Sequence, residues 1–237
     1  MIKGEIRKRQ ILETAESLFA ERGYEATSVQ DILDVLHLSK GSFYHHFESK
    51  EIVLQKICEN RALLAAMKIC GESSPDGLEE MKKLLKAMIP FQGEGLAFLK
   101  MILPVFILPE GKSIRAAYQD ALKTNWKEPT VNALEKMIQQ NQAFTPYPEK
   151  TAEIALDLVN DFWAEISEEM IRSEKEGKMA SPSQLLSIAE PYRAAIENLF
   201  SAPYGSIDLI QLEDLSSMVE AIHLWWMVEP APDASES

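Results

Sequence analysis

The stretch TSVQDILDVLHLSKGSFYHHF, residues 27–47, predicts two short helices joined by a turn of three residues. Thr27 can begin the first helix, because Gln30 follows three residues later as a capping-box partner. Apolar residues then recur at helical spacing and stop at Leu36, so we expect the first helix to end there.

The second helix follows the turn His37-Leu38-Ser39, where the Ser39 hydroxyl can accept from the first free backbone N–H groups. Phe43 and Phe47 lie one helical turn apart and are expected to face the core. Helix, turn and helix in this order are the layout of a helix-turn-helix unit, whose second helix enters the major groove of DNA.

The outward face of that second helix carries the groups that DNA recognition needs. Lys40 and Ser42 can reach base edges, and Gly41 lets the backbone approach the DNA closely. Tyr44 and His45 offer donors to phosphate oxygens. These five residues are therefore the first candidates for direct contact with DNA.

Lys50 supplies an independent argument, since it falls in the first turn of a helix that Ser49 can cap. A cation at that position opposes the helix dipole by about 0.3–1 kcal/mol. A DNA phosphate at the same helix N-terminus would compensate for this and complete an anion site. The alternative is that Lys50 pairs with Glu51 or Glu48 in solvent.

Apolar spacing predicts helices on both sides of this unit and gives almost no sign of strands. Residues 4–22 form one helix, which Gly23 ends, and a fourth helix begins after Ser49 and continues toward Cys70. Further helices are expected near residues 76–90, 94–108, 112–143, 148–176, 182–201 and 208–228. Three of them contain a proline that should kink or split them, namely Pro104, Pro129 and Pro191.

The predicted fold class is all-α, with an N-terminal DNA-binding head at 1–60, a C-terminal helical domain at 61–230 and a disordered tail at 231–237. Charge follows the same division. Residues 1–61 hold nine Lys and Arg against ten Asp and Glu, whereas residues 62–237 hold 15 against 27. The net charge of −13 therefore belongs almost entirely to the C-terminal part and does not exclude DNA binding by the head.

Composition favours a cytoplasmic protein. With 46% hydrophobic and 26% charged residues, disorder throughout is excluded. Two cysteines, Cys58 and Cys70, are too few for a disulfide framework. The N-terminus lacks the apolar run of a signal peptide, and the most apolar stretch, Leu96 to Leu108, is shorter than the roughly 20 residues that span a bilayer. We therefore expect no membrane segment.

Residues 5–58 as a whole resemble the DNA-binding domain of the tetracycline-repressor (TetR) family of transcriptional regulators. The resemblance rests on three motifs: ILETAESLFAERGYEATS at 11–28, SKGSFYHHF at 39–47, and SKE at 49–51. It implies an all-α homodimer with a three-helix head that binds double-stranded operator DNA. It also implies a C-terminal helical domain that dimerises and binds a small-molecule effector, which would release a repressor of transcription from its operator.

The same resemblance implies which residues contact DNA. They lie at the start of the second helix, on the recognition helix and at the start of the fourth helix: Thr27, Ser28, Ser39, Lys40, Gly41, Ser42, Tyr44, His45 and Lys50. His45 stands where an aromatic Tyr or Trp is usual in the family.

Two other functions are weighed against this one: an all-α enzyme that carries a helix-turn-helix, and a protein-interaction adaptor that uses the acidic helices. No Ser-His-Asp or Cys-His set is apparent, and three of the four histidines fall within residues 37–46. Glu220 and His223 have the spacing of a di-iron pair, but such a site needs a second pair and two further glutamates. We therefore predict no enzyme activity, no catalytic residue, no metal and no cofactor.

The effector cavity is predicted from one helix that is apolar on every side. Leu96 to Leu108 must be surrounded, and Pro104 leaves one carbonyl in its middle without a helical partner. With Pro129 acting similarly on the next helix, the two would bound a mainly hydrophobic pocket for a largely apolar effector. The pocket should touch Phe98, Met101, Ile102, Val105, Tyr118, Leu122 and Phe162. The alternative is an ordinary close-packed core.

Two apolar stripes are candidates for the dimer interface. One consists of Ala155, Leu158, Val159, Phe162, Ile166 and Met170, and the other of Leu185, Ile188, Ala189, Tyr192, Ile196 and Leu199. Two such helix pairs can pack as a four-helix bundle across a two-fold axis. The alternative is that both stripes are buried within one subunit.

Overall fold

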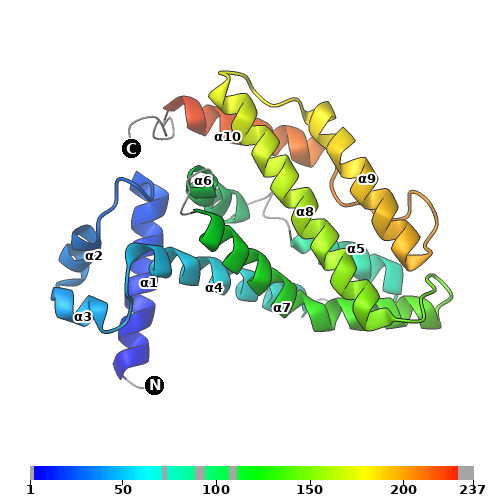
Figure 1. Cartoon of the computed structure of the whole chain (residues 1–237), viewed down its shortest axis with the longest axis horizontal. Coiled ribbons are helices and arrows are strands. Elements are labelled where there is room, and N and C mark those ends of the chain that lie inside the picture. Colours follow the sequence, from blue (N-terminus) through cyan, green and yellow to red (C-terminus); the bar gives the residue numbers. More distant parts are fainter. Residues whose placement is uncertain (1–2, 71–73, 89–93, 107–110, 229–237) are drawn as a thin grey trace.

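The computed structural model describes residues 3–70, 74–88, 94–106 and 111–228, and these contain ten α-helices and no strand (Figure 1). The helices are α1 (Lys3–Arg22), α2 (Val29–Leu36), α3 (Lys40–Tyr44), α4 (Lys50–Cys70), α5 (Gly77–Ala87), α6 (Glu94–Phe106), α7 (Gly111–Gln139), α8 (Pro148–Lys175), α9 (Pro182–Phe200) and α10 (Leu212–Val228). The all-α prediction is therefore confirmed. The predicted tail at 231–237 lies outside the described residues.

The cap of α2 differs from the prediction, because it is Ser28 and not Thr27. The Ser28 hydroxyl accepts from the Asp31 backbone N–H at 3.2 Å, and the Asp31 carboxylate accepts from the Ser28 backbone N–H at 2.7 Å. This is a capping box with Asp31 in the place predicted for Gln30. Both pairs satisfy the same spacing rule, so the sequence pattern does not separate them.

The turn and α3 follow the predicted order. His37 closes α2 in a left-handed conformation with φ of 52°, and Ser39 caps α3 by accepting from a backbone N–H. α3 is regular only over Lys40–Tyr44, although the apolar spacing continues beyond it. Phe43 is fully buried and Phe47 is 3% exposed, so both face the core as predicted.

α4 leaves the head and packs along α7 in the C-terminal part of the molecule. α7 also contacts α5 and α8, and α8 packs against α9. α6 contacts α1, α7 and α10, while α10 packs on α9 and α8 (Figure 1). α6 is therefore surrounded, as its apolar pattern predicts, and Leu99, Ile102 and Leu103 have no exposed surface.

The internal prolines do not split their helices. Pro104 lies within α6, Pro129 within α7 and Pro191 within α9. Figure 1 shows α7 changing direction partway along its length. Of the two outcomes predicted, a kink or a split, the split does not occur in any of the three helices, and a bend is seen in the long helix that contains Pro129. Packing on both sides holds each helix together across the missing hydrogen bond.

α10 begins at Leu212, four residues after the start expected from the sequence, because the preceding loop is bound to a buried carboxylate. Glu197, 2% exposed, accepts from the backbone N–H groups of Gly205 at 3.0 Å and Ile207 at 2.9 Å. Arg193 donates to the same carboxylate at 2.7 Å. The loop thus satisfies its backbone groups without helical bonds.

The two predicted dimer stripes face one another inside the chain. Five of the six residues on the α8 stripe are buried, and the rings of Phe162 on α8 and Tyr192 on α9 lie 5.8 Å apart. On α9, Leu185, Ala189 and Ile196 are buried as well. The structure therefore favours the alternative in which these stripes form the core of one subunit.

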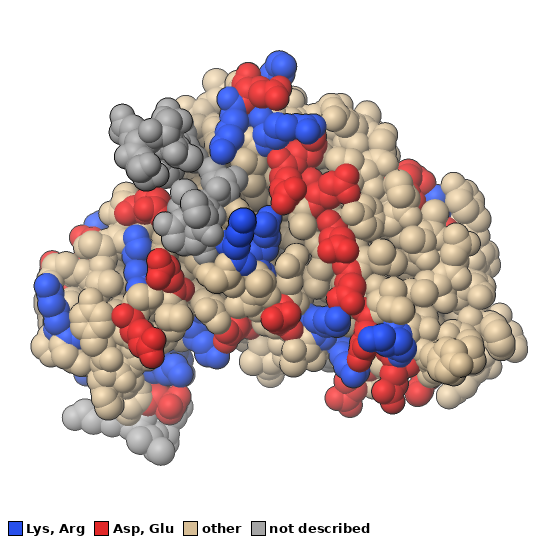
Figure 2. Space-filling view, in the orientation of Figure 1, with Lys and Arg blue, Asp and Glu red and all other residues tan. Residues whose placement is uncertain are grey.

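The outer face of α8 is acidic. Figure 2 shows a band of Asp and Glu crossing the molecule along the line that α8 follows in Figure 1. Two cations from α7 pair with this face, Lys123 with Asp157 at 2.7 Å and Arg115 with Glu168 at 3.0 Å. In the parts of the chain that the structure describes, no helix combines the length and the apolar character needed to cross a membrane.

Candidate nucleic-acid interface

α3 presents two faces of opposite character. Phe43 points into the head and is fully buried, and it anchors α3, which packs against α2. On the other side Lys40 and Gly41 are exposed, and Tyr44 is 55% exposed. A short helix with a buried anchor and exposed donors is the arrangement that places side chains in a major groove.

The remaining predicted contacts on and around α3 also lie at or near the surface. His45, the residue after α3, is exposed, and Ser42 is half-buried. Ser39 is exposed while its hydroxyl caps the helix by accepting from the Ser42 backbone N–H at 3.3 Å. Its capping role leaves the hydroxyl hydrogen available to a phosphate oxygen.

The start of α2 offers less than the prediction supposes. Ser28 is exposed, but its hydroxyl donates to the Asp31 carboxylate. Hydrogen bonds from the side chain and backbone of Ser28 hold the pKa of Asp31 below its usual value, so this carboxylate stays charged beside the helix N-terminus. A phosphate at this point would have to displace Asp31 from Ser28.

Thr27 does not present its side chain to solvent. It is 1% exposed, and its hydroxyl lies 2.8 Å from the Gly23 carbonyl oxygen and 3.3 Å from that of Leu18. The hydroxyl thereby satisfies carbonyl groups at the end of α1. Thr27 therefore helps to fold the head, and a direct contact of its side chain with DNA would require the residue to leave this site.

In the described part of the chain Lys50 pairs with neither Glu48 nor Glu51, the alternative left open by the sequence, and its contact with a DNA phosphate stays a prediction. Its ammonium donates to the backbone carbonyls of Tyr24 at 2.8 Å and Thr27 at 3.0 Å, and it lies 4.1 Å from the centre of the Tyr24 ring. Burial lowers the pKa of Lys50 below its usual value, against the charges of Glu25 and Glu51. Lys50 thus joins the start of α4 to the loop between α1 and α2.

Basic side chains of α1 complete the surface of the head. Lys8 lies 6.0 Å from the centre of the Phe47 ring, and Arg9 pairs with Glu13 at 3.5 Å on the exposed side of the helix. Figure 2 shows Lys and Arg interspersed with Asp and Glu over the head, whereas the band along α8 is mainly acidic. This distribution agrees with the charge division expected from the sequence.

The seven residues predicted to line an effector cavity are all buried. The rings of Phe98 and Tyr118 lie 5.5 Å apart, and burial raises the pKa of the Tyr118 phenol. Phe162 contacts Tyr192 on the side toward α9. These contacts belong to the close-packed core, and a cavity among these residues stays a prediction.

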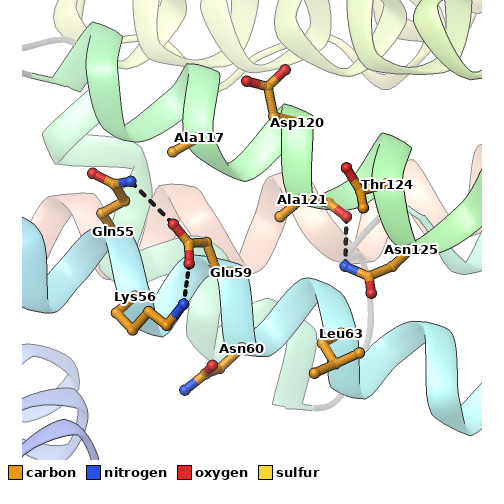
Figure 3. A pocket seen from close by; sticks show the side chains of 10 residues that line it. All are labelled: Gln55, Lys56, Glu59, Asn60, Leu63, Ala117, Asp120, Ala121, Thr124 and Asn125. Carbon is orange, nitrogen blue, oxygen red and sulfur yellow. Dashed lines mark hydrogen bonds and ion pairs between the residues drawn. The ribbon is translucent and has the colours of Figure 1, made fainter.

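A groove of about 410 Å³, which the sequence does not predict, lies between α4 and α7 (Figure 3). Its walls are formed by Gln55, Lys56, Glu59, Asn60, Leu63, Ala117, Asp120, Ala121, Thr124 and Asn125. None of the seven predicted cavity residues is among them. The sequence carries no motif for this groove, because its polar groups meet only when the two helices pack together.

Known proteins resemble this chain chiefly in the head. The family of bacterial regulatory proteins named tetR matches residues 11–57. An uncharacterised HTH-type transcriptional regulator, YerO of Bacillus subtilis, is 33% identical over 113 residues, which are 46% of this chain and 39% of that protein. The HTH-type transcriptional repressor KstR2 of Rhodococcus jostii is 49% identical over 51 residues, 22% of this chain and 25% of that protein. The matches thus span well under half of these relatives.

Solved structures extend the likeness to the whole fold. A TetR-family transcriptional regulator from Pectobacterium atrosepticum aligns with a TM-score of 0.55 and 18% identity, over 86% of this chain and all of the other. A regulator from Saccharomonospora viridis in complex with choline aligns with a TM-score of 0.51 and 22% identity, over 80% of this chain and 95% of the other. With the helix-turn-helix geometry, the family match places the head, residues 11–57, among the TetR family of bacterial regulatory proteins, and the solved structures show that the rest of the chain shares the all-α fold of such regulators.

Proposed function

We propose that this protein is a transcriptional repressor that binds operator DNA through α3 and leaves it when a small molecule binds the C-terminal domain. The observation that carries the proposal is the division of α3 into a buried anchor, Phe43, and an exposed face that bears Lys40 and Tyr44. The named function of KstR2 as a repressor supports the same direction of regulation.

Transmission between the two parts would use α4. The helix begins in the head, where Lys50 is bonded to the loop before α2, and it continues along α7 in the C-terminal part. A salt bridge of 2.5 Å between Arg61 of α4 and Glu16 of α1 fixes the head at a second point. A ligand that alters the packing of α4 on α7 would therefore alter the position of the head.

Operator binding would be dimeric, because α3 spans only five residues and a lone head makes few base contacts. Two heads on a two-fold axis would read two half-sites and gain affinity from their linkage. The compartment would be the cytoplasm, where a bacterial operator is accessible. Light scattering on the purified chain tests the dimer, with a monomer at micromolar concentration as the contrary result.

DNA binding is tested by selection from a random DNA library, followed by gel shift on the enriched sequence. We expect a two-fold symmetric consensus, and Lys40→Ala should weaken its binding by about 1–3 kcal/mol. Glu135→Gln, an exposed change on α7, is the matched control and should bind as the wild type does. Failure to enrich any sequence at low salt would contradict the proposed function.

A further inference from the structure

The groove between α4 and α7 has the size of a small-molecule site. Its volume of about 410 Å³ falls within the roughly 300–1,000 Å³ typical of ligand pockets. Ala117 and Ala121, one turn apart on α7, are the residues that leave space opposite α4 (Figure 3). Larger side chains at these positions would fill the groove.

A carboxylate lies between the two helices. Glu59 of α4 accepts from Gln55 at 3.0 Å and from Lys56 at 2.5 Å, and Figure 3 shows its side chain on the side of α4 that faces α7. Burial alone would raise the pKa of Glu59. Hydrogen bonds from Lys56 and Gln55, together with the charges of Lys56 and Lys8, outweigh burial and lower this pKa below its usual value. Glu59 is therefore ionised at neutral pH and keeps lone pairs for another donor.

The other polar groups of the groove supply acceptors more than donors. Asn125 donates its amide to the Ala121 carbonyl at 2.7 Å, so its side-chain oxygen remains an acceptor. Asp120 is exposed at the rim, and within the described part of the chain it has no hydrogen-bond or ion-pair partner. With Lys56 as the single cation against Glu59 and Asp120, the groove carries a net charge of −1.

We propose that this groove binds a small primary amine, whose ammonium group bonds to Glu59 while Asp120 attracts it from the rim. An ammonium offers three donors and a positive charge, which match an acceptor-rich groove of negative charge. No aromatic side chain is among the groove residues, so the site suits a primary amine and not a quaternary one, which aromatic faces would hold.

The bound amine would act as the effector, and this part of the inference rests on the proposed repressor function. The ammonium competes with Lys56 for Glu59 of α4, and its charge also acts on Asp120 of α7. Two residues along, Arg61 ties α4 to Glu16 of α1, and the charge of Lys8 in α1 acts on Glu59 itself. Amine binding therefore changes the contacts that set the head against the C-terminal part.

Calorimetric titration of the full-length protein with 1,5-diaminopentane tests the site. The control ligand is 1,5-pentanediol, which has the same length without the charge, and sodium chloride keeps the ionic strength equal. We expect saturable binding of the diamine alone. Glu59→Gln should weaken it about tenfold or more, because a charged hydrogen bond is lost. Asp120→Asn should weaken it roughly threefold.

Filling the groove provides a test that does not depend on charge. Ala121→Leu and Ala117→Leu should abolish diamine binding, whereas Ala116→Leu, on the exposed side of α7, should leave it intact. Thermal melting confirms that each variant is folded, and the isosteric Glu59→Gln keeps the test open if a leucine variant unfolds. Equal binding of the diol, or unchanged diamine binding in Glu59→Gln and both leucine variants, would overturn the site.

Gel shifts with and without the diamine separate the two proposals. Operator binding that weakens at least fivefold with the diamine, and not with the diol, supports the effector role. If the protein binds operator and diamine independently, the groove is a site but not the effector site, and the inference on regulation is overturned. Diamine binding by a protein that binds no DNA would instead overturn the proposed function while the site remains.

Discussion

At the scale of single residues, the head depends on Lys50 for its shape. Lys50→Ala would leave the carbonyls of Tyr24 and Thr27 without their donor, so we expect the free energy of unfolding to fall by about 1–3 kcal/mol. Lys40→Ala, on the exposed face of α3, should change it by less than about 0.5 kcal/mol while weakening operator binding. Urea denaturation measures both, and equal stability of the two variants would contradict the structural role of Lys50.

A second prediction at this scale concerns Glu197. Burial alone would raise the pKa of this carboxyl group. Hydrogen bonds from Ile207, Gly205 and Arg193 outweigh burial and lower the pKa below its usual 4.5. A lowered pKa in the folded state stabilises the fold above pH 4.5, and this contribution is lost as the pH falls through the folded value. Glu197→Ala should cost about 3–5 kcal/mol at neutral pH and flatten the acid branch of the stability profile. An acid branch identical to that of the wild type would contradict the assignment.

The sequence predicts residue roles where they depend on neighbours along the chain. The Ser39 cap and the inward face of Phe43 follow from spacing alone, and the structure contains both. The partners of Lys50 lie 23 and 26 residues away, so no local pattern could name them. The same holds for Glu59, whose groove is completed by residues of α7.

At the scale of elements, the turn between α2 and α3 rests on one left-handed residue. His37 has φ of 52°, a conformation that a β-branched side chain adopts only at considerable cost. We expect His37→Val to be less stable than His37→Gly by about 1–2 kcal/mol. Chemical denaturation of the two variants checks this. Equal denaturation midpoints of His37→Val and His37→Gly would mean that the turn relaxes around the valine. The two variants should then differ in operator binding.

The packing of α8 on α9 gives a prediction that separates a core from an interface. Phe162 is fully buried within one chain, so Phe162→Ala should cost about 3–5 kcal/mol whatever the oligomeric state. The exposed neighbour Asp161→Ala is the control and should cost little. Thermal melting combined with light scattering measures both effects. If Phe162→Ala gives a stable, folded monomer, the α8 stripe belongs to the dimer interface and not to the core of one subunit.

Helical periodicity explains why the elements were predicted and their partners were not. An apolar stripe indicates that a helix buries one face. The sequence pattern of the stripe is the same whether the helix packs against its own subunit or against another one. The stripes on α8 and α9 are therefore readable in the sequence, while their pairing is not. Likewise, a proline predicts a lost hydrogen bond, but the packing around α6 and α9 decides whether the helix continues.

At the scale of the whole molecule, the acidic C-terminal part should slow the approach of DNA. The chain carries a net charge of −13, and the helix-turn-helix head contributes little of it. Repulsion of this kind acts over the Debye length, about 30 Å at 0.01 M salt and about 8 Å at 0.15 M. It therefore affects association at low salt far more than at physiological salt.

Neutralising exposed acidic residues away from the head tests this repulsion. Glu135→Gln, Asp161→Asn, Asp208→Asn and Glu220→Gln together change the net charge from −13 to −9, and none of these side chains has an ion-pair partner among the described residues. We expect the association rate with operator DNA to rise about two- to fivefold at 0.01 M salt and to equal the wild-type rate at 0.15 M.

The matched control exchanges Asp and Glu at the same four positions, which keeps the charge and should keep the rate. Stopped-flow fluorescence measures both. An equal gain at both salt concentrations would show that the substitutions act on the bound complex and not on the approach, because only the long-range field is removed by salt.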